Sequence, residues 1–600
     1  MIASLTLTAL QAAYRSGELS PSGLIEQLLR RSAEVADHAV WISPPDATRL
    51  RQRARELEAA DMRGLPLYGI PFAIKDNIDL AGVPTTAGCP DYAYTPRESA
   101  TVVQRLLDAG AIALGKTNLD QFATGLNGTR SPYGACRNAF NPGFISGGSS
   151  SGSAVAVALG LASFALGTDT AGSGRIPAAF NNLVGLKPSC GLLSTHGIVP
   201  ACRSLDVPSI FALSATDAQR VFAVALAEDA RDPYSRPAQP HGFDFGSSAR
   251  FRFGVPKARN LRFFGDADAP RLFADALQLL RRLGGEAVEI DLEPFFEVAR
   301  LLYEGPWVAE RYQAIRDFVE NHPQALLEVT RGIIGGAARW LAADAFAAQY
   351  RLRELRRLCE GAWRQVDCMV TPTAGTIYSI EQMLAEPVAR NSELGLYTNF
   401  MNLLDYAAVA VPAGQRADGL PFGVSLFAPA HQDLPLLRLA ARWQQQRGRP
   451  CGAREAAPAP VDTELPSPVP SGRMRLVAVG AHLSGMPLHH QLAERDARLV
   501  AATHTAACYR LYALPDGRRP ALVRVTEGGA RIACEVWDLP AQSFGGLLAG
   551  TAAPLGLGSV LLDDGSSACG FICEPAGLEG AHDITRHGGW RAWVAARACV

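Results

Sequence analysis

The chain has 600 residues, which is too many for one hydrophobic core, so at least two domains are expected. Apolar residues make up 48% and charged residues 19% of the sequence, and this composition excludes a wholly disordered chain. With 57 basic and 58 acidic residues, the net charge of -1 shows no global basic excess, so nucleic acid is not an expected partner.

Targeting and metal-binding signals are weak. The first residues lack a basic flank before their apolar positions, so no signal peptide is expected. The longest apolar run, near residues 154–166, is too short for a membrane span and predicts a core helix. The 12 cysteines are scattered, without paired zinc-ligand spacing, which predicts free thiols, no metal site and a cytoplasmic location.

In chain order, residues 1–60 predict helices, and Ser20 and Pro21 are residue types that start a helix. Residues 68–77 predict a buried strand, residues 101–109 a helix and residues 111–114 a short strand. Alternation of this kind continues to about residue 430 and predicts an α/β fold. Inside it, residues 294–365 are rich in helix formers, and residues 337–359 form the clearest helical run.

The sharpest domain boundary lies in a stretch with many prolines. We expect a first domain at residues 1–450, a proline-rich linker at 451–473 and a second domain at 474–600. Residues 474–480 predict the opening strand of that second domain. Its short strand-like runs and glycine-rich turns indicate a smaller β-rich or α+β fold.

Two Gly/Ser-rich segments are the most informative part of the sequence. They are Gly-Gly-Ser-Ser-Ser-Gly-Ser at residues 147–153 and Gly-Thr-Asp-Thr-Ala-Gly-Ser-Gly-Arg-Ile-Pro at residues 167–177. Glycine allows close backbone approach, and a serine hydroxyl can act as nucleophile or proton relay. Taken singly, each segment also fits an ordinary turn, and Lys75 fits a solvated strand end.

A third segment is misleading. Residues 110–117 match the phosphate-loop pattern of Gly, four residues, then Gly-Lys-Thr. Such a loop follows a strand and opens a helix, whereas the interior Ala-Ile-Ala-Leu has the character of the strand itself. Nucleotide binding is therefore not expected.

Together these segments resemble the amidase signature family. The resemblance covers about residues 20–440 and includes residues 69–76, 115–118, 147–153, 168–178 and 185–188. It implies a mixed β-sheet core sandwiched by helices. It also implies a Ser-cisSer-Lys triad in which Lys75 is the base, Ser149 the bridging serine after a cis peptide bond, and Ser173 the acylated nucleophile. No cofactor or metal is implied.

The physical chemistry of these residue types fits the implied roles. A serine hydroxyl is a weak nucleophile until a neighbour takes its proton, and a lysine can take it only when uncharged. Burial lowers the pKa of a lysine from its ordinary value of about 10.4. The resemblance implies an oxyanion hole made by the backbone amides of Thr170, Ala171, Gly172 and Ser173. Asp169 and Arg175 are interpreted as supports of this loop.

Ala171 stands where the family pattern usually has the first of two glycines. A residue with a Cβ atom disfavours positive φ. We therefore expect the loop to keep φ negative at this position.

Within the family, residues 302–312 and the appended second domain resemble allophanate hydrolase, as do residues 170–177 and 199–206. Tyr303 and Arg311 are eight residues apart, and on a continuous helix they would share a face. The resemblance implies that both bind the substrate carboxylate, for which a guanidinium offers a bidentate fork. A packed tyrosine and a surface arginine are the structural alternative.

The second domain opens with residues 479–488, which resemble a γ-glutamylcyclotransferase-like fold. The resemblance to allophanate hydrolases implies that this domain helps to process a carboxylated intermediate. His482, His490 and Glu535 are its ionisable candidates, and a role in stabilising a dimer is the competing interpretation.

The expected function is hydrolysis of allophanate to ammonia and carbon dioxide in urea degradation, with a functional link to urea carboxylase. The protein is expected to be a homodimer and to have no membrane partner. An amidotransferase subunit for glutamyl-tRNA, an amidase of a related carboxylated urea or biuret, and a non-catalytic binding protein are the alternatives. The intact set of Lys75, Ser149 and Ser173 argues against the last.

Overall fold

A computed structural model describes residues 4–454 and 472–598 of the chain. These residues form two compact units. The first contains the described residues up to 239 and from 251 to 454, and the second contains residues 240–250 and those from 472 onward. Most of the predicted linker, residues 455–471, lies outside the described residues.

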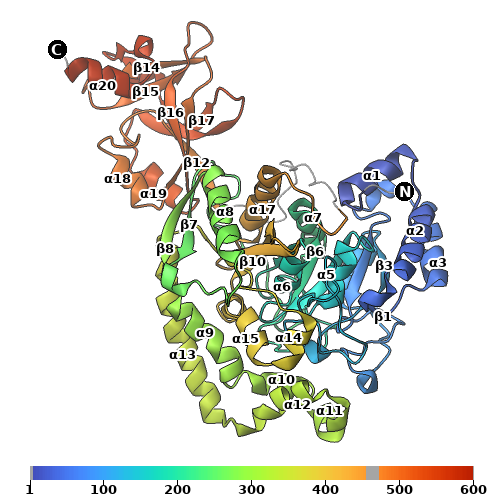
Figure 1. The fold of residues 1–600 in the computed structure, drawn as a ribbon. Helices are drawn as coiled ribbons and strands as arrows, with labels where there is room; N and C mark the ends of the chain where they lie inside the picture. The colour runs from blue at the N-terminus through green and yellow to red at the C-terminus, as the bar shows by residue number, and fades with distance from the viewer. Residues whose placement is uncertain (1–3, 455–471, 599–600) are drawn as a thin grey trace. The chain divides into compact units, whose positions relative to one another are not determined.

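The first unit is built on one mixed sheet. Among the described residues it has eleven strands (Figure 1), in the order β1 (Trp41–Ser43), β3 (Ile112–Thr117), β2 (Pro71–Lys75), β4 (Phe164–Asp169), β6 (Val207–Ala212), β5 (Val184–Lys187), β10 (Ala407–Gln415), β11 (Pro421–Ala428), β9 (Cys368–Pro372), β7 (Phe251–Pro256) and β8 (Gly285–Ile290). The expected α/β fold with a mixed sheet is therefore confirmed.

The centre of this sheet explains where the Gly/Ser-rich segments lie. β2 pairs in parallel with both β3 and β4, and Phe72 faces Phe164 in the register. Lys75 ends β2, and Asp169 ends the neighbouring β4. Because the carboxyl ends of parallel strands lie at the same edge of a sheet, Lys75 and the loop after β4 come together there.

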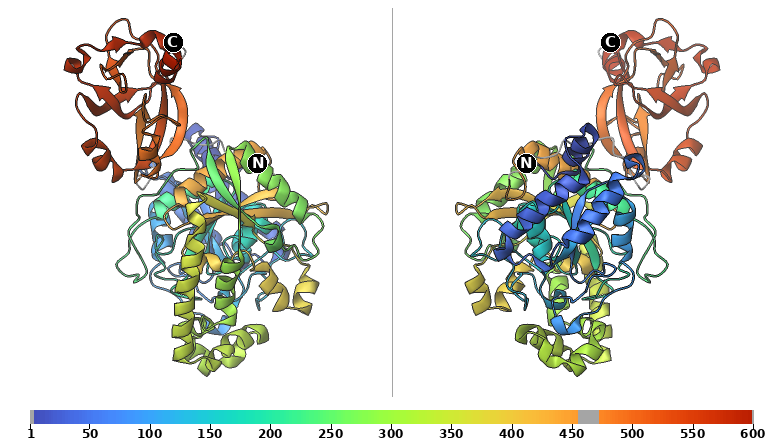
Figure 2. Two further views of the ribbon diagram at one scale, coloured as in Figure 1. Left: turned by 90° about the vertical axis from the view of Figure 1, so that its left-hand side faces the viewer. Right: turned by 90° about the vertical axis from the view of Figure 1, so that its right-hand side faces the viewer.

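Helices surround the sheet. They are α1 (Leu7–Ser16), α2 (Pro21–Glu34), α3 (Ala47–Glu58), α4 (Thr101–Asp108), α5 (Ser151–Ala158), α6 (Ile176–Phe180), α7 (Ala215–Ala225), α8 (Ala269–Arg282), α9 (Glu293–Glu304), α10 (Val308–Ala314), α11 (Arg316–Asn321), α12 (Glu328–Gly335), α13 (Ala342–Glu360), α14 (Ile380–Ala385), α15 (Ala389–Leu394), α16 (Phe400–Leu403) and α17 (Asp433–Arg447). The two opposite views of Figure 2 show the blue helices α1–α3 on one flank of this unit and the yellow-green α9 and α13 on the other, with α10–α12 at the lower end in both views.

Several sequence predictions hold in detail. Ser20 is the N-cap of α2, its hydroxyl accepts the amide of Gly23 at 3.1 Å, and Pro21 occupies the first turn. All five residues of β2 are buried. Residues 112–117, inside the phosphate-loop pattern, form strand β3, so the interpretation of this segment as a strand is confirmed.

The prediction of one core helix over residues 154–166 is wrong in its second half. Helix α5 ends at Ala158, and strand β4 begins at Phe164. Gly160 has φ of +64°, a left-handed conformation in which a helix cannot continue. The run is apolar apart from Ser163 because both a buried helix and a buried strand cross the core, and periodicity alone does not separate the two.

The helical run predicted over residues 337–359 also begins later than expected. A 3₁₀ turn occupies residues 336–339, and α13 starts at Ala342. The carboxylate of Asp344 accepts the amide of Leu341 at 2.8 Å, which satisfies a free donor at that helix start.

The second unit has two smaller sheets. In the described residues the larger follows the order β13 (Arg498–His504), β16 (Ala533–Pro540), β12 (Arg473–Ala478), β18 (Ser567–Cys573) and β17 (Leu555–Leu561). The smaller has β15 (Pro520–Arg524), β14 (Tyr509–Ala513) and β19 (His582–Asp583). The helices are α18 (His489–Ala493), α19 (Ser543–Ala549) and α20 (Trp590–Ala598). The predicted opening strand is β12, and a smaller sheet domain is confirmed.

Residues 240–250 belong to this second unit although the sequence does not set them apart. The amide of Gly472 donates to the carbonyl of His241 at 3.2 Å, and the guanidinium of Arg473 lies 5.9 Å from the centre of the Phe243 ring. Across the described residues of both units, no helix is long and apolar enough to cross a membrane.

Candidate active site

Lys75, Ser149 and Ser173 form one hydrogen-bonded chain. The Nζ atom of Lys75 lies 2.8 Å from Ser149 Oγ, and Ser149 Oγ lies 3.0 Å from Ser173 Oγ. Lys75 and Ser149 are fully buried, and Ser173 is 3% exposed. A proton can therefore pass from Ser173 through Ser149 to Lys75 without entering bulk water.

Thr168 is a fourth member that sequence reasoning missed. Its hydroxyl oxygen accepts from Lys75 Nζ at 2.7 Å and from the side-chain amide of Asn77 at 3.4 Å. A neutral amine that donates to Thr168 keeps its lone pair available for the Ser149 proton. Thr168 stands next to Asp169 in the second Gly/Ser-rich segment, so its position was visible in the sequence, but its role was not.

The first Gly/Ser-rich segment wraps closely around Asp120. The peptide bond between Gly148 and Ser149 is cis, as the family resemblance implies. A Cβ atom on Gly148 would lie 2.1 Å from a carboxylate oxygen of Asp120 and 2.7 Å from the amide nitrogen of Asn127. Only glycine fits such a space, and so the backbone can bring Ser149 next to Lys75.

Burial sets the acid–base behaviour of Lys75. It lowers the pKa of this amine from 10.5 to about 7, although the carboxylates of Asp120, Asp206 and Asp169 oppose the shift. Near neutral pH about half of the Lys75 amines are therefore uncharged and able to accept a proton.

An ion pair shapes the loop that carries Ser173. Both carboxylate oxygens of Asp169 accept from the guanidinium of Arg175, each at 2.9 Å, and both side chains are fully buried. The same carboxylate accepts the backbone amides of Gly172 and Gly174, each at 2.9 Å. The two residues therefore support the loop, in agreement with their interpretation from the sequence.

The contacts of the loop amides differ from the expectation at one residue. The amide of Gly172, one of the four expected to bind an oxyanion, already donates to Asp169. In the described part of the chain, the amides of Thr170, Ala171 and Ser173 donate to no protein acceptor. Ala171 is not among the residues with positive φ, which agrees with the expectation for it.

Asp206 holds the other side of this loop and was also missed. Its carboxylate accepts from the hydroxyl of Thr170 at 2.5 Å. It also accepts the backbone amide of Ala201 at 2.7 Å and that of Cys202 at 3.1 Å. Burial raises the pKa of Asp206 to about 6, although these hydrogen bonds oppose the shift.

Tyr303 and Arg311 meet, but not on a continuous helix as the spacing argument assumed. Helix α9 ends at Glu304, Gly305 is extended, and α10 begins at Val308. Pro306 explains the break, because a proline disfavours helical conformation at the residue before it. The Arg311 guanidinium donates to the Tyr303 hydroxyl at 3.2 Å and lies 5.3 Å from the centre of its ring.

Arg311 is a buried cation, only 3% exposed. Its other contacts are with the carbonyl of Ala123 and the hydroxyl of Thr124, each at 3.3 Å, and its Nε atom has no partner. No carboxylate pairs with this guanidinium among the residues that the structure describes. Because buried charges are normally paired, the arrangement suits a bound anion.

The histidine candidates of the second unit have unequal surroundings. His482 stacks on Phe571 with ring centres 4.7 Å apart, and its Nε2 atom lies 3.0 Å from the side-chain oxygen of Gln491. Burial lowers the pKa of His482. His490 is exposed, and its Nδ1 atom lies 3.0 Å from the carbonyl of Pro487.

Glu535 has a different environment. Its carboxylate accepts from the backbone amide and the hydroxyl of Ser484, from the indole of Trp537 and from the guanidinium of Arg591. A buried carboxylate with this many hydrogen-bond donors is fixed in place by them, which favours a structural role.

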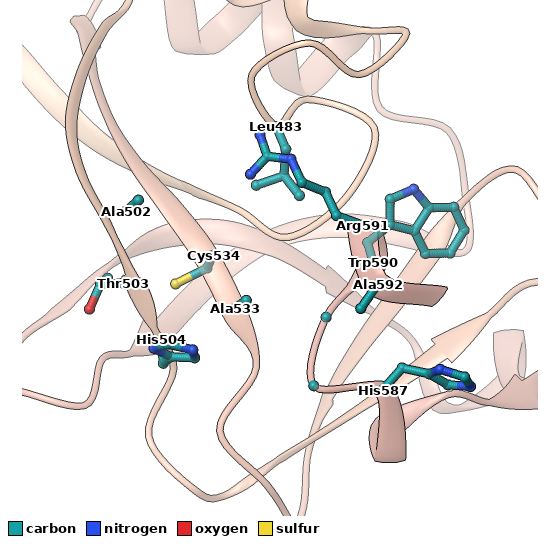
Figure 3. A pocket seen from close by; sticks show the side chains of 12 residues that line it. Leu483, Ala502, Thr503, His504, Ala533, Cys534, His587, Trp590, Arg591 and Ala592 are labelled. Atoms are coloured by element: carbon teal, nitrogen blue, oxygen red, sulfur yellow. The ribbon is translucent and has the colours of Figure 1, made fainter. Parts of the chain in front are cut away.

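Figure 3 shows a pocket of about 480 Å³ in the second unit that none of these three candidates lines. His504 and His587 line it from separate segments, with Thr503, Cys534 and Arg591. Two of these side chains are engaged elsewhere, since Thr503 donates to Asp563 and Arg591 to Glu535. Among the described residues, no group of three His, Cys, Asp or Glu side chains is arranged to hold a metal ion.

Comparison with known proteins identifies both units. The profile of the Amidase family matches residues 23–437, which include Lys75, Ser149 and Ser173. The chain belongs to the amidase family. The profile of the allophanate hydrolase C-terminal domain matches residues 474–595 of the same amidase.

The chain is similar to named relatives and to solved structures. Urea amidolyase of Saccharomyces cerevisiae is 45% identical over 592 residues, which cover 95% of this chain and 32% of that protein. A glutamyl-tRNA(Gln) amidotransferase component from Symbiobacterium thermophilum is 35% identical over 479 residues, 74% of this chain and 96% of that protein. The structure of Kluyveromyces lactis allophanate hydrolase superposes with a TM-score of 0.80 at 41% identity, covering 98% of this chain and 99% of the other.

The amidase therefore spans about a third of the length of the urea amidolyases that it matches, 32% in both the S. cerevisiae and the Lachancea kluyveri protein.

Proposed function

We propose that this amidase is an allophanate hydrolase that uses Ser173 as its nucleophile. The observation that carries the proposal is the buried chain from Lys75 through Ser149 to Ser173, together with a buried Arg311 whose charge acts on the Lys75 amine and which forms no ion pair with a protein carboxylate among the described residues. The first feature suits amide hydrolysis, and the second suits an amide with a carboxylate. The likeness to allophanate hydrolase over both units supports the same substrate.

In the acylation step, neutral Lys75 takes the hydroxyl proton of Ser149 while Ser149 takes that of Ser173. The Ser173 oxygen then forms a bond to the carbonyl carbon of the terminal amide. As the tetrahedral intermediate collapses, the C–N bond breaks and the proton returns along the same chain to the nitrogen, which leaves as ammonia. Water hydrolyses the acyl-enzyme by the same relay.

The developing negative charge on the carbonyl oxygen needs donors that are not already bonded. The amides of Thr170, Ala171 and Ser173 meet this condition, so we propose them as the oxyanion hole and leave out Gly172. One such donor is worth about 2.7–4 kcal/mol in the transition state. Gly172 acts instead through Asp169, which fixes the shape of the loop.

Arg311 and Tyr303 bind the carboxylate at the other end of the substrate. A guanidinium and a phenol are donors of suitable geometry, and burial strengthens their interaction with an anion. Hydrolysis at the terminal amide gives N-carboxycarbamate. This product can lose carbon dioxide and release a second ammonia.

Further parts of the proposal concern the whole protein. Its proposed functional divisions are an amidase domain at 1–450, a linker at 451–473 and a second domain at 474–600. In the second domain, His482 is the proposed residue for processing the carboxylated product. Fusion in the urea amidolyases supports a link to urea carboxylase. A homodimer and a cytoplasmic location complete the proposal.

The alternative is an amidotransferase component, which the likeness to the S. thermophilum glutamyl-tRNA(Gln) amidotransferase favours for the first unit alone. That likeness covers 74% of this chain, and the contact between Tyr303 and Arg311 has no explanation under it.

Ammonia release by the purified chain separates the two functions. Allophanate is supplied without ATP, tRNA or a partner protein, and Ser173→Ala is the control. Ammonia release by the wild-type protein but not by Ser173→Ala supports the hydrolase. Activity that requires glutamine and tRNA overturns it in favour of the amidotransferase.

A further inference from the structure

A second buried arginine lies beside the proposed carboxylate site. Arg130 is 3% exposed, as is Arg311. In the described residues neither guanidinium forms an ion pair with a carboxylate, and the Nε atom of each has no hydrogen-bond partner. The charge of Asp120 acts on Arg130, and the charges of Asp206 and Glu310 act on Arg311, although none of these carboxylates forms an ion pair with either guanidinium. An anion bound between the two neighbouring cations would stabilise both further.

Both guanidinium groups bind the same short turn. Arg130 donates to the carbonyl of Thr124 at 2.8 Å. Arg311 donates to the carbonyl of Ala123 and to the hydroxyl of Thr124, each at 3.3 Å. The turn therefore connects the two cations.

The backbone of this turn needs outside support. Phe122 and Ala123 have φ of 50° and 53°, in the left-handed region that residues with a Cβ atom rarely adopt. The turn lies at the end of η4 (Gln121–Ala123), whose Gln121 amide donates to the carbonyl of Arg130 at 2.7 Å. Arg130 thus contacts the turn with both its carbonyl and its guanidinium.

Arg130 is itself fixed on two further sides. Its backbone amide donates to Asp120 at 2.9 Å, and its guanidinium donates to the carbonyl of Pro387 at 2.5 Å. Pro387 lies between α14 and α15. In α15 the side-chain oxygen of Asn391 accepts the amide of Leu126 and the side-chain amide of Asn127, each at 2.8 Å, so Pro387 and Asn391 together make three hydrogen bonds to residues 126–130.

We propose that Arg130 is a positioning residue for carboxylate recognition. It holds the turn at residues 122–124 in the conformation that fixes Arg311, and it adds a second positive charge that favours a carboxylated amide over a neutral one. This inference rests on the proposed function, because it concerns the anionic end of the same substrate. Arg130 takes no part in the proton relay.

The test compares two substrates that differ at one group. Biuret has a neutral carboxamide where allophanate has its carboxylate. In full-length Arg130→Gln, the ratio of kcat/KM for allophanate to that for biuret should fall about tenfold or more, mainly through a higher KM for allophanate. Arg130→Lys keeps the positive charge but loses the bidentate guanidinium, so its ratio of kcat/KM values should lie between those of the wild type and Arg130→Gln.

The matched control is Arg416, another buried arginine of the first unit that donates to a backbone carbonyl but pairs with Asp266. Arg416→Gln should lower Tm without changing the ratio of the two substrates. A ratio in Arg130→Gln within about twofold of the wild-type value overturns the inference. If Arg130→Gln does not fold, an unchanged ratio in Arg130→Lys overturns it.

The outcome for Arg130 is distinguishable from that for the proposed function. A wild-type protein that hydrolyses biuret but not allophanate overturns the function. In that case the role of Arg130 is tested by measuring how strongly oxamate, a carboxylated amide, inhibits biuret hydrolysis. Inhibition about tenfold weaker in Arg130→Gln supports the positioning role, and equal inhibition overturns it.

Discussion

Lys75 and Ser149 share a hydrogen bond of 2.8 Å at a place that is closed to solvent, because both side chains are fully buried. The burial that brings them together also lowers the pKa of the amine to about 7. Structure and acid–base chemistry are therefore linked: the same environment that excludes water makes Lys75 a usable base near neutral pH.

The pH dependence of turnover follows directly. Lys75 accepts a proton only when it is uncharged, so kcat/KM for allophanate should rise about tenfold per pH unit below pH 7 and become level above it. Steady-state ammonia release between about pH 5 and 9 measures this profile. A flat profile over that range would contradict the assignment of Lys75 as the base.

Stability should depend on the same amine in the corresponding direction. The unfolded chain keeps the Lys75 proton up to its ordinary pKa of 10.5, whereas the folded protein releases it at about 7. The unfolded state therefore binds more protons in this window, and stability rises with pH through it. Lys75→Met removes the buried charge, so its gain in Tm should be larger at acidic than at alkaline pH. Equal gains at both ends would be inconsistent with a lowered pKa.

The two serines should be equally necessary. Ser173→Ala removes the acyl carrier, and Ser149→Ala interrupts the relay, so kcat should fall by about a factor of ten thousand or more in each. Ser153→Ala is the matched control, because its hydroxyl lies in the same Gly/Ser-rich segment but donates to the carbonyl of Leu166 at 2.9 Å. Single-turnover assays would exclude the relay if Ser149→Ala retained most of the acylation rate.

Arg311 should act on binding rather than on the chemical step. A hydrogen bond to a charged group is worth about 1.5–3 kcal/mol, so Arg311→Ala should raise KM for allophanate by about ten- to a hundredfold with a smaller change in kcat. The neighbouring Glu310→Ala is the control, since Glu310 accepts from the amide and hydroxyl of Ser204. An unchanged KM in Arg311→Ala would remove this residue from the carboxylate site.

Local patterns in the sequence are enough to find the buried strand that ends at Lys75 and the two Gly/Ser-rich segments. Glycines at such positions indicate that the backbone packs closely against other groups, as Gly148 packs against Asp120. Pro306 likewise indicates that the helix breaks between Tyr303 and Arg311. The spacing of eight residues between them does not show this break.

Other features depend on contacts between distant parts of the chain, which no local pattern contains. The pairing of Arg130 with the carbonyl of Pro387 joins residues 257 positions apart. The bond from the Gly172 amide to Asp169 is local, but it follows from how the whole loop folds around Arg175. Such contacts decide which amides and charges remain free for a substrate.

The ion pair of Asp169 and Arg175 should dominate the stability of the Ser173 loop. Arg175→Met leaves a buried carboxylate without its cation, a change that costs about 3–5 kcal/mol in the free energy of unfolding. The same change frees the carboxylate that holds the amides of Gly172 and Gly174, so turnover should be lost even at temperatures where the variant is folded. Arg51→Met is the control, because Arg51 and Glu26 form an ion pair at the surface and its removal should alter stability little. Urea unfolding of both variants measures the difference. Equal losses in the two would mean that Asp169 is stabilised by its backbone amides alone, and that the loop does not need Arg175 to hold its shape.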